Sequence, residues 1–494
     1  MEDKQKLIID MMLTNEQTAH ETKSANTLGH SITRRAYIVV DAYAREFAAQ
    51  KINDPWIRMP GLRGIGKTTL LTQLYDNPAF RNATKIYISF ERLNLINASM
   101  QDFVDACETY LGSSFETYNK PIVLLLDEVQ YLEKWGVGLK IIRDRAKRVF
   151  IICTGSSAIA LSDASDPNVA RRVDTIKLHP LCFTEYAMIK QVHQGVKPQE
   201  INMPIPQLAE DVKRALFKSR DAEQCYIELA KLTPKINTYW TNLASVGLKS
   251  ELFGEFIVKG TLPFTLSLLN DSAVWRRING ILRESLDKDM TQFGNFDNDI
   301  IKIIPKLLFK LAFSVETSMN NISTELGIHI RTVGSILSAL EKTEIINAIP
   351  PKGAHNGNVK KASKYLFTSP AMRAALCNYG GIITPENSAN LKGKLIEDTV
   401  GMYLKRMFFD TSMTTAIVEY DTAQGGADFI LSPDGKRPSS IVIEVGANKS
   451  TGSQAIQTMS EIGGKYGLIV TSGKLDFDRA NKLVRVPFEY FLLA

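Results

Sequence analysis

Residues 61–69 read Gly-Leu-Arg-Gly-Ile-Gly-Lys-Thr-Thr, a glycine-rich stretch that ends in a lysine and two threonines. A phosphate chain carries several negative charges and needs many hydrogen-bond donors at close range. Gly61, Gly64 and Gly66 allow the backbone to wrap tightly and to turn its N–H groups inward. A helix that begins at the end of such a loop adds the partial positive charge of its N-terminus. The pattern therefore predicts a phosphate-binding loop between a strand and a helix.

Two side chains complete the predicted nucleotide site. We expect Lys67 to reach the β- and γ-phosphates and Thr68 to supply a hydroxyl to Mg²⁺. The surrounding sequence meets the requirement for a strand and a helix, because residues 55–59 are short and extended in pattern and residues 69–75 are helical in pattern. The alternative is a glycine turn with a nearby surface lysine.

An acidic strand end follows the loop. Residues 122–126 form a continuous apolar run that ends at Asp127 and Glu128, and similar runs occupy 85–90 and 149–153. Continuous apolar runs are typical of strands buried on both faces, as in a parallel α/β sheet. We expect Asp127 to hold Mg²⁺, directly or through water, and Glu128 to orient and deprotonate the attacking water. The alternative is that both acids merely meet solvent.

Several motifs together resemble the archaeal-type AAA+ ATPases, a family also widespread in bacteria. They are the glycine-rich loop with Thr69 as its last residue, Leu-Leu-Asp-Glu-Val-Gln at 125–130, Thr-Gly-Ser-Ser at 154–157 and the segment 178–186. The resemblance implies an ATP hydrolase with ATP and Mg²⁺ as cofactors, and it adds Thr69 to the nucleotide-binding residues. The polar residues at 154–157 are expected to contact the γ-phosphate or the water, unless they form a plain polar turn.

The same resemblance implies a role for the arginine pair Arg171 and Arg172. One of them would act as a nucleotide sensor or as an arginine finger toward a neighbouring subunit of a homo-oligomer, and we place Arg172 among the nucleotide-binding residues. The alternative is a surface arginine pair. Residues 259–263 resemble more weakly the turn found in the helical lid of the family.

Composition limits the class of protein. With 494 residues, three or four domains are expected. No apolar run reaches the ~18–20 residues that span a bilayer, and the polar N-terminus favours the cytoplasm over secretion. The five cysteines form no CxxC pair, which argues against a disulfide framework or a zinc ribbon. A net charge of +6 permits nucleic-acid binding without arguing for it.

A helix-turn-helix pattern follows the mostly helical region. Residues 321–340 read as a short helix, a glycine turn and a second amphipathic helix, and a β-like run and a Pro/Gly/Lys-rich loop follow. This looks like a winged helix, which the ATPase family often carries here. The second helix offers His329, Arg331 and Thr332 near its start for contacts with DNA. The loop offers Lys352, Lys360 and Lys361, and phosphate contacts from these lysines would be independent of DNA sequence. The alternative is a winged helix used for protein contacts or as part of the lid.

The last hundred residues, after a polar stretch at 385–390 that we expect to be a linker, resemble the PD-(D/E)XK nuclease fold. The resemblance implies that Glu397, Asp428 and Glu444 gather Mg²⁺ or Mn²⁺, which activates water and neutralises a phosphodiester. The lysine usual two residues after the last acid is replaced by Gly446, and Lys449 is expected to take its place. The alternative is a fold that keeps the acids without the catalysis.

The predicted fold class is α/β, a P-loop AAA+ parallel sheet with a helical lid, a winged helix and a C-terminal α/β restriction-endonuclease-like domain. The expected domains are an N-terminal helical segment at 1–50, the AAA+ ATPase core at 51–190, the lid at 191–300, the winged helix at 301–380 and the nuclease-like domain at 391–494. By family analogy, ATP would control DNA binding or cleavage, in defence or mobile-element biology. The competing hypothesis is a nucleotide-switched scaffold whose inactive nuclease-like domain docks a protein partner.

Overall fold

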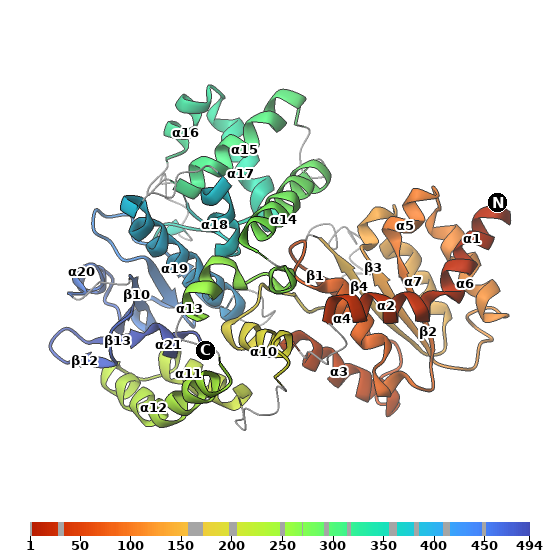
Figure 1. Cartoon of the computed structure of the whole chain (residues 1–494), viewed down its shortest axis with the longest axis horizontal. Coiled ribbons are helices and arrows are strands. Elements are labelled where there is room, and N and C mark those ends of the chain that lie inside the picture. The colour runs from red at the N-terminus through yellow and green to blue at the C-terminus, as the bar shows by residue number, and fades with distance from the viewer. Residues whose placement is uncertain are drawn as a thin grey trace. The chain divides into compact units, whose positions relative to one another are not determined.

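The structure is a computed structural model of the whole chain. It describes residues 2–27, 34–156, 171–196, 205–247, 252–268, 270–290, 296–313, 318–354, 363–379, 385–408, 415–446 and 451–494. The chain divides into two compact units, Met1–His179 and Pro180–Ala494 (Figure 1). The boundary between the units therefore precedes residue 190, where the sequence analysis ended the ATPase core. No helix in the described part of the chain is long and apolar enough to cross a membrane.

The first unit is built on a parallel sheet of five strands in the order β2-β3-β4-β1-β5. Its strands are β1 (Trp56–Pro60), β2 (Thr84–Ser89), β3 (Ile122–Asp127), β4 (Val149–Gly155) and β5 (Asp174–Thr175). Its helices are α1 (Glu2–Leu13), α2 (Asn15–Thr27), α3 (Arg35–Ala48), α4 (Lys67–Tyr75), α5 (Phe90–Leu95), α6 (Met100–Leu111) and α7 (Trp135–Arg145), with short 3₁₀ turns η1 (Pro78–Phe80) and η2 (Val129–Tyr131). Strands β1 to β4 match the runs at 55–59, 85–90, 122–126 and 149–153, whereas the short, exposed β5 was not predicted.

Helices cover both faces of this sheet, as the buried strands require. Phe150 on β4 packs against Phe47 of α3 and Phe80 of η1, while its neighbour Ile151 belongs to a core cluster on the opposite face. That cluster includes Ile8 of α1, because α1 packs on α6. The N-terminal helices are thus part of the first unit and contribute to its core.

The registers of the strands bring their carboxyl ends to one edge. Ser89 of β2 lies opposite Asp127 of β3, and Leu126 lies opposite Cys153 of β4. Pro60 of β1 lies opposite Gly155. The loop after β1, the acids after β3 and the polar residues after β4 therefore meet along the same edge of the sheet.

The second unit contains a mixed sheet of six strands, a two-stranded sheet and many helices. Its helices are α10 (Phe183–His193), α11 (Ile205–Phe217), α12 (Ala222–Ser245), α13 (Leu252–Glu255), η4 (Phe256–Gly260), η5 (Pro263–Ser267), α14 (Asp271–Glu284), η6 (Ser285–Asp289), α15 (Asn298–Phe313), α16 (Met319–Leu326), α17 (Ile330–Lys342), α18 (Pro370–Tyr379), α19 (Pro385–Phe408), η9 (Arg437–Ser439), α20 (Ser453–Ile462) and α21 (Phe488–Phe491). Of these, η4 and η6 are π-helical segments, and η5 and η9 are 3₁₀ turns. Its strands are β6 (Ile346–Ile349), β7 (Lys364–Phe367), β8 (Ile417–Glu419), β9 (Phe429–Ser432), β10 (Ile441–Val445), β11 (Tyr466–Thr471), β12 (Asp476–Asp478) and β13 (Leu483–Pro487).

The six-stranded sheet has the order β12-β13-β11-β10-β9-β8. Strands β10, β11 and β13 run parallel, whereas β8, β9 and β12 pair antiparallel with their neighbours. Two helices that the sequence analysis assigned to a lid, α11 and α12, cover part of this sheet: α12 packs on β12 and β13. The Tyr466 hydroxyl on β11 donates a hydrogen bond to the carbonyl of Leu216 on α11, at 2.7 Å.

One further feature differs from expectation. Residues 385–390, which we expected to be a linker, form the first turns of α19; proline is favourable in the first turn of a helix because its missing N–H has no helical partner there. A buried ion pair then fixes α19 against α18: the Arg373 guanidinium holds the Asp398 carboxylate, with Nη2 2.9 Å from Oδ1. All five cysteines are buried free thiols.

Candidate functional site: the nucleotide-binding edge

The loop after β1 folds as the glycine pattern predicts. Gly64 and Gly66 have φ values of 78° and 92°, which other residues rarely adopt. Gly61 needs the absence of a side chain for a different reason: a Cβ there would lie 2.4 Å from the carbonyl oxygen of Leu178. Gly66 is the N-cap of α4, so the loop ends directly at a helix N-terminus, a favourable place for phosphate oxygens.

Lys67, the first residue of α4, is buried with its ammonium turned back over the loop. Its Nζ donates to the carbonyl oxygens of Gly61 and Leu62, at 3.0 and 3.3 Å. The same Nζ lies 3.5 Å from Oε1 of Glu128. The ammonium of Lys67 is thus buried and hydrogen-bonded to carbonyl oxygens of its own loop. The oxygens of a phosphate can replace these carbonyl oxygens as acceptors. The arrangement fits a phosphate chain.

The predicted magnesium ligands lie side by side. The Thr68 hydroxyl donates to Oδ2 of Asp127 at 2.7 Å, and the Thr154 hydroxyl donates to Oδ1 of the same carboxylate. Asp127 is buried, and burial together with the neighbouring charge of Glu128 raises the pKa of its carboxyl group. A buried carboxylate beside a hydroxyl is the donor set that Mg²⁺ prefers, so these residues fit the ion in chemical kind.

Glu128 stands beside them in a strained conformation. Its φ of 53° places a non-glycine residue in the left-handed region, where such residues are costly and cluster at functional sites. Its backbone N–H donates to the Thr154 hydroxyl at 3.1 Å. Burial alone would raise the pKa of Glu128, but the Lys67 ammonium, the Gln130 amide and the Arg63 guanidinium outweigh it and lower the pKa. Glu128 is therefore held as a carboxylate beside the loop.

Two residues at this edge were missed from sequence. The Gln130 amide donates to Oε2 of Glu128 and, at 3.2 Å, to the Ser156 hydroxyl, so it joins the acidic end of β3 to the polar end of β4. Its place in the motif at 125–130 could have indicated this role. Arg34 donates to the carbonyls of Ile65 and His179, both at 2.6 Å, and so supports the loop. No local pattern marks Arg34.

Two residues that we predicted to bind nucleotide, Thr69 and Arg172, make no described side-chain contact with this cluster. Thr69 is the third residue of α4, and no contact of its side chain with Lys67, Thr68 or Asp127 is among those described. Arg172 is not among these residues: its half-exposed guanidinium is ion-paired with Asp144 on α7. A contribution of Arg172 to a nucleotide site would thus be to that of a second subunit, which stays a prediction.

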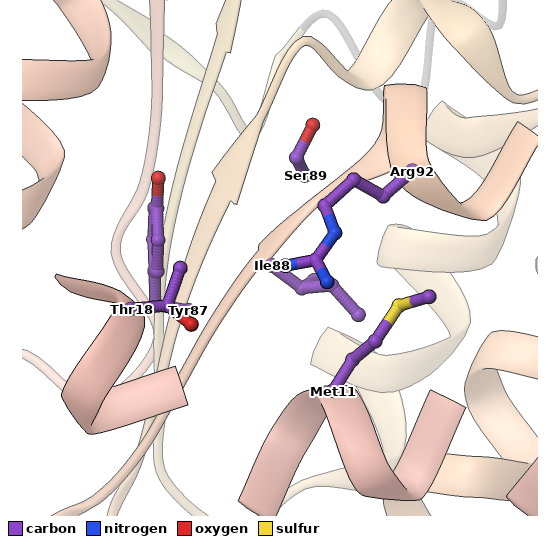
Figure 2. A pocket seen from close by; sticks show the side chains of 6 residues that line it. All are labelled: Met11, Thr18, Tyr87, Ile88, Ser89 and Arg92. Atoms are coloured by element: carbon purple, nitrogen blue, oxygen red, sulfur yellow. The ribbon is translucent and has the colours of Figure 1, made fainter. Parts of the chain in front are cut away.

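A small pocket also opens in this unit, and no residue of the glycine-rich loop lines it. It has a volume of about 40 Å³ and is lined by Met11, Thr18, Tyr87, Ile88, Ser89 and Arg92. Figure 2 shows the Arg92 side chain extending toward Ile88 and Met11. Burial, together with the charge of Asp127, raises the pKa of Tyr87. The pocket holds none of the predicted site residues.

The second unit brings two of its three predicted metal ligands together around a lysine. Glu397 on α19 and Asp428, which precedes β9, both face Lys364 of β7: Lys364 Nζ is ion-paired with Glu397 and lies 3.5 Å from Oδ1 of Asp428. Burial raises the pKa of Glu397, while the ammonium of Lys364 acts in the opposite direction. Lys364 was not predicted, because nothing in the sequence near it indicates acids that follow tens of residues later.

The third acid, Glu444 on β10, uses its side chain differently. Its Oε2 accepts a hydrogen bond from the backbone N–H of Ala455 on α20, at 3.1 Å. The pairing of β10 with β9 nevertheless places Val445, the residue after Glu444, beside Asp428. The backbone N–H of Val445 donates a hydrogen bond to Oδ2 of Asp428 at 2.8 Å. Within the described ranges, no three Asp, Glu, His or Cys side chains are grouped so that they could hold a metal ion. Lys449 lies outside the described residues.

The helix-turn-helix segment has the expected local structure. Helices α16 and α17 are separated by Gly327 with φ 65°, and β6 and β7 pair antiparallel behind them. Arg331 is exposed at the start of α17. Lys352, expected to contact phosphate, is instead ion-paired with Asp421 at 2.8 Å and with Glu461. Lys360 and Lys361 lie outside the described residues.

Comparison with known proteins matches two segments of the chain. Residues 53–187 match the family model described as "AAA domain", and residues 250–381 match "Domain of unknown function (DUF8612)". An uncharacterized protein of Methanocaldococcus jannaschii is 29% identical over 452 residues, which cover 88% of this chain and 84% of the relative. An uncharacterized protein of Haemophilus influenzae is 28% identical over 162 residues, 32% of this chain and 39% of that protein.

Solved structures of three proteins were also found. The Aeropyrum pernix ORC2 protein has a TM-score of 0.37 and 12% identity, over 72% of this chain and 96% of that one. The Thermotoga maritima RuvB Holliday junction branch migration motor has a TM-score of 0.28 and 13% identity, over 66% of this chain and 94% of that one. Domain III of the Thermotoga maritima replication initiation protein DnaA has a TM-score of 0.26 and 22% identity, over 33% of this chain and 71% of that one. TM-scores this low do not establish a common overall fold. The family match and the geometry of the loop together show that the first unit contains an AAA domain of the P-loop class.

Proposed function

We propose that the chain is a Mg-ATP-dependent AAA+ ATPase that couples ATP binding and hydrolysis to DNA binding or cleavage. One observation carries the first part of this proposal: the ammonium of Lys67, the Thr68–Asp127 pair and the ionised Glu128 lie together at one edge of a parallel sheet. A phosphate-binding loop, a metal-binding acid and a base are the three parts that hydrolysis of a nucleoside triphosphate requires.

Each residue would have one task in this reaction. The loop N–H groups around Gly64 and Gly66 and the Lys67 ammonium would bind the phosphates, and Thr68 and Asp127 would hold Mg²⁺. The ion, when bound, neutralises charge on the phosphate oxygens. Glu128 would accept a proton from the attacking water at Oε1 or Oε2, and its lowered pKa keeps it ionised for this purpose.

The test is ATP hydrolysis by the full chain with and without double-stranded DNA. We expect hydrolysis in the presence of Mg²⁺, its loss in Lys67→Ala, and a change in rate when DNA is added. Lys120→Ala, which alters a lysine of the same unit that lies outside the loop, serves as the control. A protein that neither binds nor hydrolyses adenine or guanine nucleotides would exclude the proposal, and a rate unaffected by DNA would exclude the coupling.

DNA is the proposed partner of the helix-turn-helix segment. The exposed Arg331 at the start of α17 and the adjoining two-stranded sheet support a winged helix that contacts the phosphate backbone. Arg331→Ala should weaken binding to duplexes of any sequence and reduce its salt dependence. The match of residues 250–381 to a domain of unknown function is neutral on this point.

The nuclease-like domain at 391–494 is supported by the strand order and the acids. Antiparallel β8, β9 and β10, then α20 and the parallel β11, form a sheet in which Asp428 and Glu444 lie near the adjoining ends of β9 and β10. Cleavage of DNA with Mg²⁺ or Mn²⁺ that is lost in Asp428→Ala and Glu444→Ala would support an active nuclease. Absence of cleavage of any DNA or RNA by the wild-type protein would exclude it.

A second candidate, a nucleotide-switched scaffold with an inactive nuclease-like domain, is favoured by a separate observation. Position 446 holds glycine in place of lysine, and Glu444 is engaged with the backbone of α20. This candidate predicts nucleotide-dependent binding of a protein or DNA without cleavage. The protein would act in the cytoplasm, in defence or mobile-element biology, and particle size with and without ATP tests whether Arg172 has a neighbouring subunit to act upon.

A further inference from the structure

A lysine from outside the nuclease-like domain lies within its acidic site. Lys364 is the first residue of β7, and β7 follows the helix-turn-helix segment and pairs with β6. Its half-buried side chain reaches Glu397 on α19 and Asp428 before β9. These contacts join residues from two segments of the second unit that the sequence suggests are separate domains.

The ammonium of Lys364 is surrounded by groups that favour a cation. It is ion-paired with Glu397 and lies 3.5 Å from Oδ1 of Asp428. It also lies 5.4 Å from the ring centroid of Phe429 and 5.9 Å from that of Tyr420, within the range of a cation–π interaction. The site thus binds one positive charge in the state that the structure describes.

That position is the one a divalent metal ion would need. A magnesium ion binds carboxylate oxygens at about 2.0–2.1 Å, so an ion shared by Glu397 and Asp428 would occupy the space between them. The ammonium already lies there, and two cations cannot occupy the same space or tolerate each other at contact distance. Binding of a divalent ion therefore requires the side chain of Lys364 to leave.

Lys364 can leave without unfolding β7. The strand is anchored at its other end, because the N–H of Phe367 donates to Oδ1 of Asp398 at 3.0 Å, and Asp398 is in turn held by Arg373. The four-carbon stem of a lysine is flexible and its ammonium is readily hydrated. A movement of the side chain, or of the first residues of β7, is then sufficient to uncover the acids.

We propose that Lys364 is an internal competitor for the divalent cation: its ammonium holds Glu397 and Asp428 when the acidic site is closed, and the site binds Mg²⁺ or Mn²⁺ only when Lys364 withdraws. The inference rests on the proposed metal-binding role of these acids. A ligand that moves β7 away from the two acids, such as a polynucleotide bound to the two-stranded sheet, would raise the affinity for the divalent ion. Because thermodynamic linkage is reciprocal, the bound ion would raise the affinity for that ligand by the same factor.

The test is Mn²⁺ binding, measured on the full chain by the electron paramagnetic resonance signal of free Mn²⁺. Asp127→Asn is present in every protein, so that the nucleotide site does not titrate. Lys364→Gln should bind Mn²⁺ about ten-fold more tightly than the lysine form, a coupling of ordinary size. Lys364→Arg, which keeps a cation, should resemble the lysine form. Adding Asp428→Asn to Lys364→Gln should abolish the gain.

A matched control is Lys465→Gln. Lys465 is a half-buried lysine of the same unit whose Nζ donates to the carbonyl oxygen of Ser219 at 2.8 Å, so that its described partner is a neutral group and not a carboxylate. It should leave Mn²⁺ affinity unchanged. Equal or weaker binding by Lys364→Gln with an unchanged far-ultraviolet circular dichroism spectrum, or a gain that persists with Asp428→Asn, would overturn the inference. Tighter binding without any cleavage of DNA would uphold it and reject only the nuclease activity.

Discussion

Replacement of Glu128 by glutamine tests the hydrolytic part of the nucleotide site. The side chain is 14% exposed; its Oε1 lies 3.5 Å from Lys67 Nζ, and its Oε2 accepts a hydrogen bond from Gln130. Glutamine keeps the shape and one oxygen acceptor, but it cannot take a proton from water. We therefore expect kcat for ATP hydrolysis to fall about 10²–10⁴-fold, which corresponds to about 3–5 kcal/mol in the activation barrier.

The assay is phosphate release at saturating Mg-ATP, with nucleotide affinity measured separately by a fluorescent ATP analogue. Affinity should be retained, because the loop and Lys67 are unchanged. Glu133→Gln is the control, since Glu133 is an exposed carboxylate on the same connection after β3. An unchanged rate in Glu128→Gln, or a loss of binding as complete as in Lys67→Ala, would refute the assignment of Glu128 as the base.

The pH dependence of stability gives an independent check on Glu128. Its pKa is lowered, so its ionised form contributes stability that is present above the unfolded pKa, about 4.3 for glutamate, and is lost as pH falls through the folded pKa. The difference in stability between wild type and Glu128→Gln should therefore shrink on acidification below that value. Urea unfolding of the nucleotide-free proteins at stepped pH measures it, and a difference that grows would contradict the lowered pKa.

Two further substitutions test packing and burial. Gly61→Ala would place a Cβ 2.4 Å from the carbonyl oxygen of Leu178, so we expect about 1–3 kcal/mol of destabilisation and weaker ATP binding. Thermal melting measures the loss of stability, and titration with the fluorescent analogue measures ATP affinity. Unaltered values of both would mean that the loop has more room than the structure shows. Arg373→Leu leaves the fully buried Asp398 without its partner and should lower the free energy of unfolding by about 3–5 kcal/mol. Arg479→Leu breaks an exposed ion pair and should lower it by only about 0–1 kcal/mol. Equal shifts in the urea midpoints of the two variants would contradict this ranking.

The nucleotide-binding edge was predictable because its parts are local in sequence. Gly64 and Gly66 determine the loop by their backbone freedom, and a fully apolar strand that ends at Asp127 determines where that carboxylate lies. Once the strands are parallel, their carboxyl ends must meet at one edge, so the loop and Glu128 come together. The support from Arg34, distant in sequence and without any motif, was not predictable.

The second unit shows where sequence reasoning stops. A helix-turn-helix pattern, a set of strands and three acids could each be recognised from residues close together in the chain, because periodicity and turn residues are local signals. Which elements pack on which was decided only by the tertiary structure: α12 covers β12 and β13, residues 385–390 extend a helix, and Lys364 meets Glu397 and Asp428. The physical reason is that burial and charge pairing act between surfaces in space, whatever the separation of their residues along the chain. The glycine-rich loop and the strands around it therefore follow from local sequence, whereas the position of Lys364 among the C-terminal acids depends on the tertiary structure.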